Sequence, residues 1–179
     1  MGAELNLPFD PIEQAGLSWQ REFGASRAMM VATSIMRVQQ VLLASYDALL
    51  KPYGLTFARY EALVLLSFSR RGELPMRVVG ERLMVHPTSA TNIVDRLVAQ
   101  RLMTRRRNPV DGRGVLAAIT AAGRAVTRDA TKDLMNAGFG LDALGDEDCD
   151  GLFDALRRVR LAAGDFVEPP AEVESPEGG

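Results

Sequence analysis

Residues 85–119 read VHPTSATNIVDRLVAQRLMTRRRNPVDGRGVLAAI, and two different periodicities meet within this stretch. Pro87 suits the first turn of a helix over 87–100. The apolar residues of that helix recur at the spacing of one helix face, at Ala90, Ile93, Val94, Leu97 and Val98. The period then changes, and the segments 102–107 and 114–119 are predicted strands joined by the turn-rich sequence NPVDG. We therefore expect a helix followed by a two-stranded hairpin.

Shorter helices are predicted on both sides of this stretch. One runs over 57–70 behind Thr56, its expected cap, and a second runs over 76–84 after a short extended piece at 73–75. Downstream, Thr120 is expected to cap a helix over 121–138. Three helices followed by a hairpin are typical of a winged helix-turn-helix, a mainly α fold with a small β-wing.

The terminal segments are also predicted to be mostly helical. Asp10 and Pro11 begin a short helix over 10–22, and Asp146 begins a last helix over 147–163. The segment after 167 is rich in Pro and Glu, which favours disorder. No uninterrupted apolar run reaches the ~18–20 residues of a membrane span, and the acidic N-terminus lacks the apolar core of a signal peptide.

The segment 25–51 is predicted to form one long helix with an unusually wide apolar surface. Two neighbouring heptad columns run through it, namely Ala28, Ile35, Leu42 and Leu49, and Met29, Met36, Leu43 and Leu50. At ~38 Å this helix is too long and too apolar for one small domain to cover. We therefore predict a subunit interface at Met29, Met36, Leu43 and Leu50, with burial as the central helix of one monomer as the alternative.

The charge is unevenly distributed along the chain. The formal net charge of the 179 residues is −2, which taken alone argues against a nucleic-acid partner. Residues 51–113, however, hold twelve Arg and Lys against five Asp and Glu, a net +7, which leaves −9 for the remainder. Nearly all of these cations are Arg, which suits phosphate and guanine but could equally reflect genome base composition. The clustering is the more informative fact.

Several function classes are disfavoured by composition. One Cys and one His exclude an intramolecular disulfide and the usual zinc site, and catalysis by a Ser-His or Cys-His pair would depend on His86 alone. The chain contains no P-loop, G-x-S-x-G or S-x-x-K motif. Cys149 has no partner and is expected to be inert. We expect a cytoplasmic, non-enzymatic protein without metal or cofactor.

The predicted third helix and the hairpin suit double-stranded DNA. Short polar side chains at the start of that helix can approach base edges in the major groove, and Arg on a hairpin suits the minor groove. The predicted contacts of the helix are His86, Pro87, Thr88, Ser89, Thr91, Asn92 and Arg96, with a cap or phosphate contact as the plainer role of His86. The predicted contacts of the wing are Arg105, Arg106, Arg107, Asp111 and Arg113.

The order of these motifs resembles the MarR family of transcriptional regulators over roughly 26–163. The matching residues are Gly54-Leu55-Thr56, Tyr60-Glu61-Ala62-Leu63, Val85-His86-Pro87-Thr88-Ser89-Ala90-Thr91, Val94-Asp95-Arg96-Leu97, Arg101-Leu102, Asp111-x-Arg113 and Ile119-Thr120-Ala121-Ala122-Gly123. The resemblance implies a homodimer whose terminal helices interlock, with one winged helix for each half of a pseudo-palindromic operator. It also implies that Asp111 braces the wing and that Arg113 enters the minor groove. Gly112 stands where the family often has Arg, which predicts a wing with fewer contacts.

The resemblance divides the chain into five segments. These are an N-terminal extension with a short extra helix (1–24), a dimerisation helix (25–51), the winged helix-turn-helix (52–120), C-terminal dimerisation helices (121–166) and a disordered acidic tail (167–179).

One subgroup of the family binds urate or similar anions and has an extra N-terminal helix with a Trp. By resemblance, Trp19 and Glu61 are candidate ligand residues, and packing of Trp19 onto the dimer core is the plainer alternative. Asn92 stands at the position of a ligand-binding Arg of that subgroup, which disfavours urate itself.

The leading hypothesis is a dimeric repressor that a small aromatic or anionic ligand releases from its operator through a population shift. The alternatives are a DNA-binding protein of this fold that does not respond to ligands, as in nucleoid-like proteins, and a winged helix that binds only protein. The expected partners are therefore double-stranded DNA, a second copy and, for a responsive protein, a small effector.

Overall fold

The computed structural model describes residues 6–109 and 114–168, and the chain divides into two compact units between Gly140 and Leu141. The second unit contains α7 (Asp146–Ala162). The first unit contains, in chain order, α1 (Pro11–Phe23), α2 (Arg27–Leu50), the 3-10 turn η1 (Lys51–Tyr53), α3 (Phe57–Phe68), β1 (Glu73–Pro75), α4 (Met76–Arg82), α5 (Pro87–Ala99), β2 (Met103–Arg107), β3 (Val115–Ile119), α6 (Ala121–Asn136) and the 3-10 turn η2 (Gly138–Gly140).

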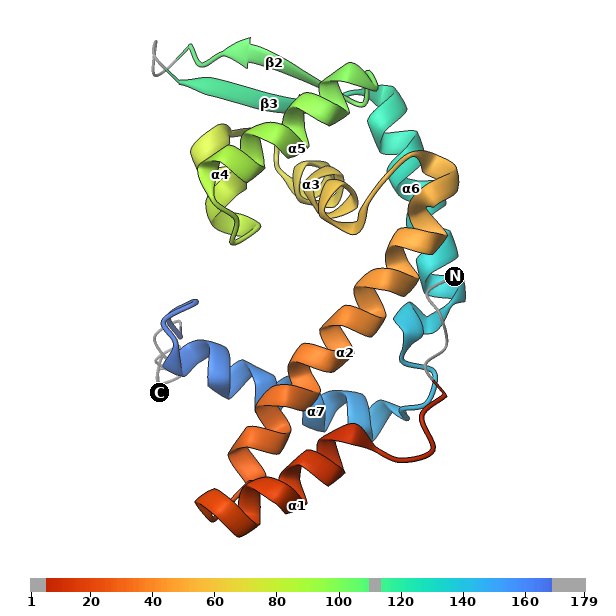
Figure 1. Cartoon of the computed structure of the whole chain (residues 1–179). Helices are drawn as coiled ribbons and strands as arrows, with labels where there is room; N and C mark the ends of the chain where they lie inside the picture. Colours follow the sequence, from red (N-terminus) through yellow and green to blue (C-terminus); the bar gives the residue numbers. More distant parts are fainter. Residues whose placement is uncertain (1–5, 110–113, 169–179) are drawn as a thin grey trace, which may run out of the picture. The chain divides into compact units, whose positions relative to one another are not determined.

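The three strands form one antiparallel sheet in the order β1-β3-β2. β3 pairs with β2 from Met103↔Ile119 to Arg107↔Val115. On its other side β3 pairs with β1, where Glu73 lies opposite Ala118, so the predicted extended piece is a third strand. Figure 1 shows this sheet projecting beside α5, with α3 and α4 below it. The predicted class, mainly α with a small β-wing, is confirmed.

The core of the first unit fixes the orientation of α5. Ala90, Val94 and Leu97 are buried in it together with Leu63, Leu66, Val79, Met103 and Leu134, and Ile93 and Val98 pack against it half-buried. The predicted apolar face of this helix is therefore correct. Burial of each large aliphatic side chain contributes roughly 1.5–3 kcal/mol. Because this face points inward, the opposite, polar face of α5 points to solvent.

Two of the predicted helix caps are confirmed. The Asp10 carboxylate accepts hydrogen bonds from the backbone N–H groups of Ile12 (2.8 Å) and Glu13 (3.4 Å) at the start of α1. The Thr120 hydroxyl accepts one from the N–H of Gly123 (2.9 Å) at the start of α6. Each satisfies a donor that the first helical turn leaves without a partner.

The cap predicted at α3 is wrong. The Thr56 side chain makes no capping hydrogen bond, and the carboxylate of Asp47 accepts one from the N–H of Phe57 instead, at 2.7 Å. Asp47 lies near the end of α2, and the tight turn of η1 brings it back to the start of α3. A carboxylate ten residues upstream is outside the local window in which caps are predicted.

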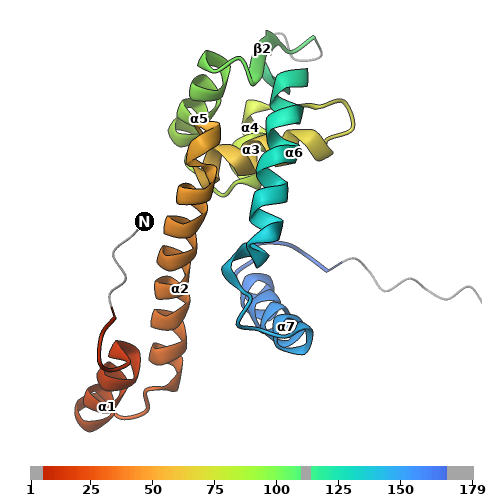
Figure 2. The same cartoon turned by 90° about the vertical axis from the view of Figure 1, so that its right-hand side faces the viewer.

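Helices α1 and α2 pack against each other, as Figure 2 shows. Gly16 of α1 allows this approach, since a Cβ at Gly16 would lie 2.6 Å from the sulfur of Met30. By length and composition alone, Arg27–Tyr53 is the one helix among the described residues that could cross a membrane. The sequence predicted no membrane span because that prediction required an uninterrupted apolar run. In α2, polar residues such as Thr33 and Gln39 lie among the apolar ones, although the mean hydropathy of the helix is high. The core helix of a soluble protein passes the same test.

The second unit ends in a short segment that folds back on α7. The guanidinium groups of Arg157 and Arg160 lie 5.0 Å and 5.6 Å from the ring centroid of Phe166. Arg157 also donates a hydrogen bond to Glu168 at 2.7 Å. The start of the predicted acidic tail is thus part of this unit, and residues 169–179 lie outside the described residues.

Candidate nucleic-acid interface

The polar side chains at the start of α5 lie together on the solvent-facing side of the helix. All seven residues predicted to contact DNA from this helix are exposed, namely His86, Pro87, Thr88, Ser89, Thr91, Asn92 and Arg96. They share one surface because the apolar face of the same helix is anchored in the core. An exposed helix start with short polar side chains can enter a major groove without steric conflict.

His86 occupies the N-cap position of α5. Its Nδ1 accepts a hydrogen bond from the backbone N–H of Thr88 at 3.3 Å. This hydrogen bond is the helix cap that the sequence analysis gave as the plainer role of His86. The ring is exposed, so its other nitrogen remains available at the surface.

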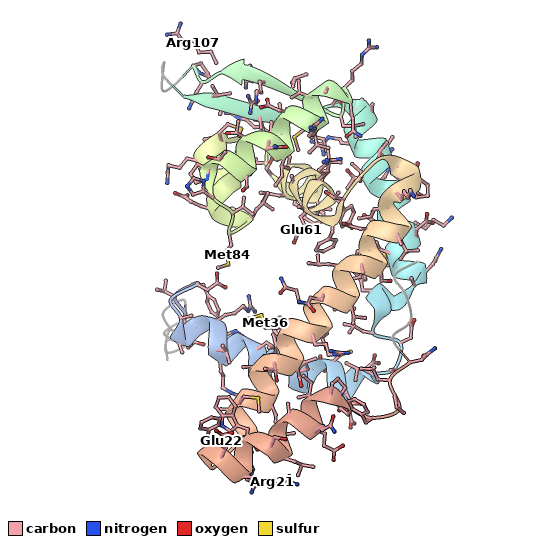
Figure 3. All side chains as sticks on the ribbon, viewed as in Figure 1. Arg21, Glu22, Met36, Glu61, Met84 and Arg107 are labelled. Atoms are coloured by element: carbon pink, nitrogen blue, oxygen red, sulfur yellow. The ribbon has the colours of Figure 1, made fainter. Side chains whose placement is uncertain are left out.

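The three consecutive Arg residues of the wing lie on β2. Figure 3 shows Arg107 at the outer end of this strand, where the hairpin projects furthest from α5. Asp111 and Arg113, which were predicted to brace the wing and to enter the minor groove, lie outside the described residues. The described part of the wing is therefore its two strands.

Arg105 joins β2 to α5. Its Nη1 lies 2.8 Å from a carboxylate oxygen of Asp95, and its Nη2 donates a hydrogen bond to the backbone carbonyl of Thr91 at 3.3 Å. Both partners belong to α5. The sequence predicted a DNA contact for Arg105, but the structure places its guanidinium on the helix that DNA would meet.

Arg106 joins β2 to β1. Its Nε donates a hydrogen bond to the Glu73 carboxylate at 2.8 Å, and its Nη2 donates to both oxygens of the same carboxylate. These hydrogen bonds lower the pKa of Glu73, and they raise the pKa of Arg106. Arg106 was also predicted to contact DNA, and its fork-shaped guanidinium is here occupied by a carboxylate.

Sequence reasoning missed the two acids of these pairs. The sequence predicted no partner for Glu73 or Asp95, although Asp95 belongs to the matching segment Val94-Asp95-Arg96-Leu97. The available signal was their rarity, since residues 51–113 hold only five acids, one of which, Glu73, begins a predicted extended segment. The pairing itself depends on strand register, which local patterns do not determine.

Comparison with known proteins finds relatives that share this winged-helix fold. A model of the MarR family matches residues 53–114. The organic hydroperoxide resistance transcriptional regulator of Bacillus subtilis is 32% identical over 111 residues, 62% of this chain and 74% of the relative. A crystal structure of Sco5413, a MarR family transcriptional regulator from Streptomyces coelicolor, is 60% identical with a TM-score of 0.74, over 79% of this chain and 98% of that one.

The chain belongs to the MarR family. Two further MarR structures bear on the questions of DNA and ligand. That of Sco3205 from Streptomyces coelicolor, in complex with DNA, is 23% identical (TM-score 0.70, 80% of this chain and 93% of that one) and supports the fold alone. That of CouR from Rhodococcus jostii RHA1, bound to p-coumaroyl-CoA, is 26% identical (TM-score 0.66, 77% and 95%).

The two candidate ligand residues of this MarR chain are not brought together within one copy. Trp19 packs on Phe23 of α1, with ring centroids 4.9 Å apart. Glu61 lies on α3, at the other end of α2 from Arg21 and Glu22 of α1 (Figure 3). The 24 residues of α2 separate them, a length of roughly 36 Å. Only a second copy could supply a Trp19 near Glu61.

Glu61 lines a small groove between α2 and α3. The groove has a volume of about 370 Å³, and its other walls are mostly apolar side chains such as Ile35 and Leu42. Burial beside these groups raises the pKa of Glu61. Glu61 is nevertheless an exposed residue, so the groove is open to solvent.

A larger cavity lies between α3 and α6. It has a volume of about 920 Å³ and is lined by Phe57, Tyr60, Val64, Ser67, Phe68, Arg124, Thr127, Arg128, Thr131, Lys132, Met135, Asn136 and Phe139. Three of these residues, Arg124, Arg128 and Lys132, are cations spaced four apart along α6. The Ser67 hydroxyl is buried and makes no hydrogen bond, while Arg124 donates one to the Ser67 carbonyl at 3.2 Å. Sequence reasoning missed this cavity, because its walls come from helices separated by more than fifty residues.

The predicted subunit interface on α2 is exposed only in part. Met36 is 61% exposed and Leu43 38% exposed, and Met29 is half-buried. Leu50 was assigned wrongly, because its side chain is 0% exposed and belongs to the core of its own chain. The heptad column leaves the helix surface there because the end of α2 turns into the winged-helix core.

Proposed function

We propose that this MarR chain is a homodimeric repressor that binds a pseudo-palindromic operator and leaves it when a small ligand binds. The observation that supports it most directly is the exposed polar start of α5 beside the basic strand β2. In this proposal His86, Thr88, Ser89, Thr91 and Asn92 approach base edges in the major groove. Arg96 lies one turn further along, where it suits a phosphate.

The wing would act next to this helix. Arg107, at the outer end of β2, is the described wing cation that we assign to the DNA backbone, and Arg113 remains the predicted minor-groove residue. A structure that shares this fold has been solved with DNA, and we assign the same use to the winged helix here. The net charge of +7 over residues 51–113 would attract DNA to the segment that holds the winged helix.

The exposed apolar face of α2 supports the homodimer. Val31, Ile35, Met36, Val38, Val41 and Leu43 are all exposed along one helix. This much exposed apolar surface along one helix is typical of an interface. We assign this apolar surface to contact with a second copy rather than with a membrane. The reason is that polar side chains such as Thr33, Gln39 and Gln40 lie at intervals among the apolar ones. Two winged helices in such a dimer would meet half-sites about 34–36 Å apart.

The cavity between α3 and α6 supports control by a ligand. Its aromatic walls suit an apolar body, and the cations on α6 together with the Ser67 hydroxyl suit an anionic group. One relative binds p-coumaroyl-CoA, which has both features. A ligand wedged between α3 and α6 would shift the winged helix and favour a spacing that misses one half-site. A protein that does not respond to ligands is the alternative, and the absence of any ligand effect on DNA binding would support it.

The DNA interface is tested by exchanging one exposed amide. Asn92→Ala removes an exposed amide side chain from the start of α5, and Gln20→Ala removes an exposed amide side chain from α1. We expect Asn92→Ala to weaken binding to a duplex selected by the wild type by about 5–150-fold, the cost of about 1–3 kcal/mol for one lost base contact. Gln20→Ala should bind that duplex as the wild type does. Equal affinities of all three proteins in a fluorescence anisotropy titration would contradict the assignment of α5.

A further inference from the structure

We propose that Arg106 is a positioning residue, which Glu73 holds so that the wing and the helix-turn-helix move as one body. The inference rests on the proposed DNA binding but assigns Arg106 a different role from its neighbour Arg107. This positioning role replaces the DNA contact that the sequence predicted for Arg106 as part of the run Arg105-Arg106-Arg107.

The first support is the path of the Arg106 side chain. In the sheet, Glu73 of β1 and Thr104 of β2 both lie opposite Ala118 of the central strand. Arg106 lies two residues along β2 from Thr104 and therefore on the same face of the sheet. Ala118 and Leu116 of β3 lie on that face, and the Arg106 guanidinium crosses β3 to reach Glu73. The pair thus ties the two outer strands together.

The second support is what β1 continues into. β1 ends at Pro75 and α4 begins at Met76, without an intervening loop. Val79 and Gly80 of α4 are buried, and a Cβ on Gly80 would meet the Cβ of Ala90 on α5 at 3.6 Å. The ion pair with Glu73 therefore links Arg106 to α4 and, through the packing of α4 on α5, to the helix proposed to read DNA.

The third support is that the neighbouring residue braces the opposite face of the same strand. Successive side chains of a strand point to opposite faces, and Arg105 reaches Asp95 and the Thr91 carbonyl on α5. β2 is therefore fixed by Arg105 on one face and by Arg106 on the other. The orientation of the wing relative to α5 follows from these two pairs, which act before any DNA is present.

The geometry of the Glu73–Arg106 pair separates it from an ordinary surface ion pair. Isolated exposed pairs contribute little, but this one is a fork of an Arg on both carboxylate oxygens. The Glu73 side chain is only 14% exposed, while that of Arg106 is 48% exposed. A DNA phosphate that took Arg106 would leave the shielded Glu73 carboxylate without its partner. The carboxylate therefore opposes the use of Arg106 as a phosphate contact.

The proposal is tested by a double-mutant cycle on the full chain with Glu73→Gln, Arg106→Gln and both together. The probes are a duplex that the wild type selects from random-sequence DNA and an unrelated duplex of equal length. We expect each single variant to weaken binding to the selected duplex about tenfold and the double variant to match the singles within about twofold. Binding to the unrelated duplex should change by less than about twofold, because the positioning role concerns register rather than charge.

The salt dependence supplies a readout that a loss of stability would not produce. Each lost phosphate contact lowers the slope of log Kd against log salt by about 0.9. We expect Arg106→Gln to leave this slope unchanged and Arg106→Lys, which keeps the charge but not the fork, to weaken selective binding as well. A slope lower by about 0.9 for Arg106→Gln, with equal weakening on both duplexes and tighter binding by Glu73→Gln, would overturn the proposal.

The matched control is the exposed pair of Arg77 and Glu81 on α4, whose side chains are 77% and 55% exposed. The cycle of Arg77→Gln and Glu81→Gln makes the same charge changes, and we expect its coupling to stay below about twofold.

Hydrogen exchange of the free protein separates this proposal from the proposed function. In both single variants the amides of β2 and β3 should exchange faster, while those of α6 should not change. Unchanged exchange in the hairpin would overturn the proposal even if the wild type binds DNA. Failure of the wild type to select any sequence would instead overturn the proposed function.

Discussion

Gly123 lies against the backbone of Leu102, so closely that a Cβ on Gly123 would be 2.2 Å from the Leu102 carbonyl oxygen. The same carbonyl accepts hydrogen bonds from the Thr120 N–H at 3.0 Å and from the Thr120 hydroxyl at 3.1 Å. The start of α6 is thus packed onto the start of the wing, with no room for a side chain between them. Gly123 is required here for space rather than for its backbone conformation.

Gly123→Ala is therefore expected to destabilise the protein strongly. Its methyl group would collide with backbone that cannot move aside, at a cost of about 1–3 kcal/mol or more. Gly151→Ala on α7 is the matched control, since nothing lies within 4 Å of its Cβ position, and better helix propensity should stabilise it by up to about 1 kcal/mol. The free energy of unfolding from urea titrations measures both. An unaffected Gly123→Ala would contradict the close packing of α6 on the wing.

The cap of α3 gives a second test. Removal of the carboxylate by Asp47→Ala should lower the free energy of unfolding by about 0.5–2 kcal/mol, because the Phe57 N–H loses its acceptor. Thr56→Ala should cost clearly less, because the Thr56 side chain makes no capping hydrogen bond. Urea titrations of the two variants decide between them, and a larger loss for Thr56→Ala would reverse the assignment.

Glu61 gives a pH-dependent prediction. Burial raises its pKa in the folded state, so folding favours the protonated form and stability falls as the pH rises from the unfolded pKa, about 4.3, through the folded one. Glu61→Gln removes this loss. The variant should be more stable than the wild type at pH 7 and indistinguishable from it near pH 4. Thermal unfolding at both pH values measures this, and equal destabilisation at both would contradict the stated cause.

The dimer proposal is tested by a charge on α2. Met36→Asp places a carboxylate at a 61% exposed position of the apolar face and should raise the dimer dissociation constant by at least about tenfold. Met84→Asp makes the same exchange at a 77% exposed position on the turn after α4 and should leave the dimer intact. Sedimentation analysis of each full-length variant measures its mass and therefore whether it is a monomer or a dimer. A monomeric wild type that floats with lipid vesicles would favour the membrane reading of α2 instead.

The cavity gives a prediction about ligands. Aromatic carboxylates such as salicylate should raise the melting temperature of the wild type, because they bind only the folded state. Ser67→Ala and Arg128→Gln should reduce this shift, since they remove a hydroxyl without a partner and a cation from the cavity wall. Lys51→Gln, outside the cavity, serves as the control for lost charge. An equal shift in all variants would place the ligand elsewhere.

The helices, the hairpin and the exposed face of α5 could be predicted because their signals are local. The apolar period from Ala90 to Val98 identifies the buried side of α5, and the change of period at Leu102 identifies the hairpin. The cap at Asp10 follows from residues within the same turn. These features depend on neighbours in sequence, which is where periodicity and capping patterns apply.

The remaining features depend on residues far apart in sequence. Asp47 replaces Thr56 as a cap because η1 folds α2 back on α3, and Leu50 leaves the predicted interface because α2 ends in the core. Arg106 meets Glu73 only through the register of a three-stranded sheet. A run of Arg residues therefore predicted the charge of the wing correctly but not the ion pairs of Arg105 with Asp95 and of Arg106 with Glu73.

In the proposed function, two copies of this chain read one DNA site through α5. This is measured most directly by selecting binding sites from a random-sequence duplex pool with the purified full chain, followed by sequencing. We expect enrichment of a two-fold symmetric sequence whose half-sites are centred about one helical turn apart, about 10–10.5 base pairs. Enrichment of no sequence, or of one without two-fold symmetry, would contradict it.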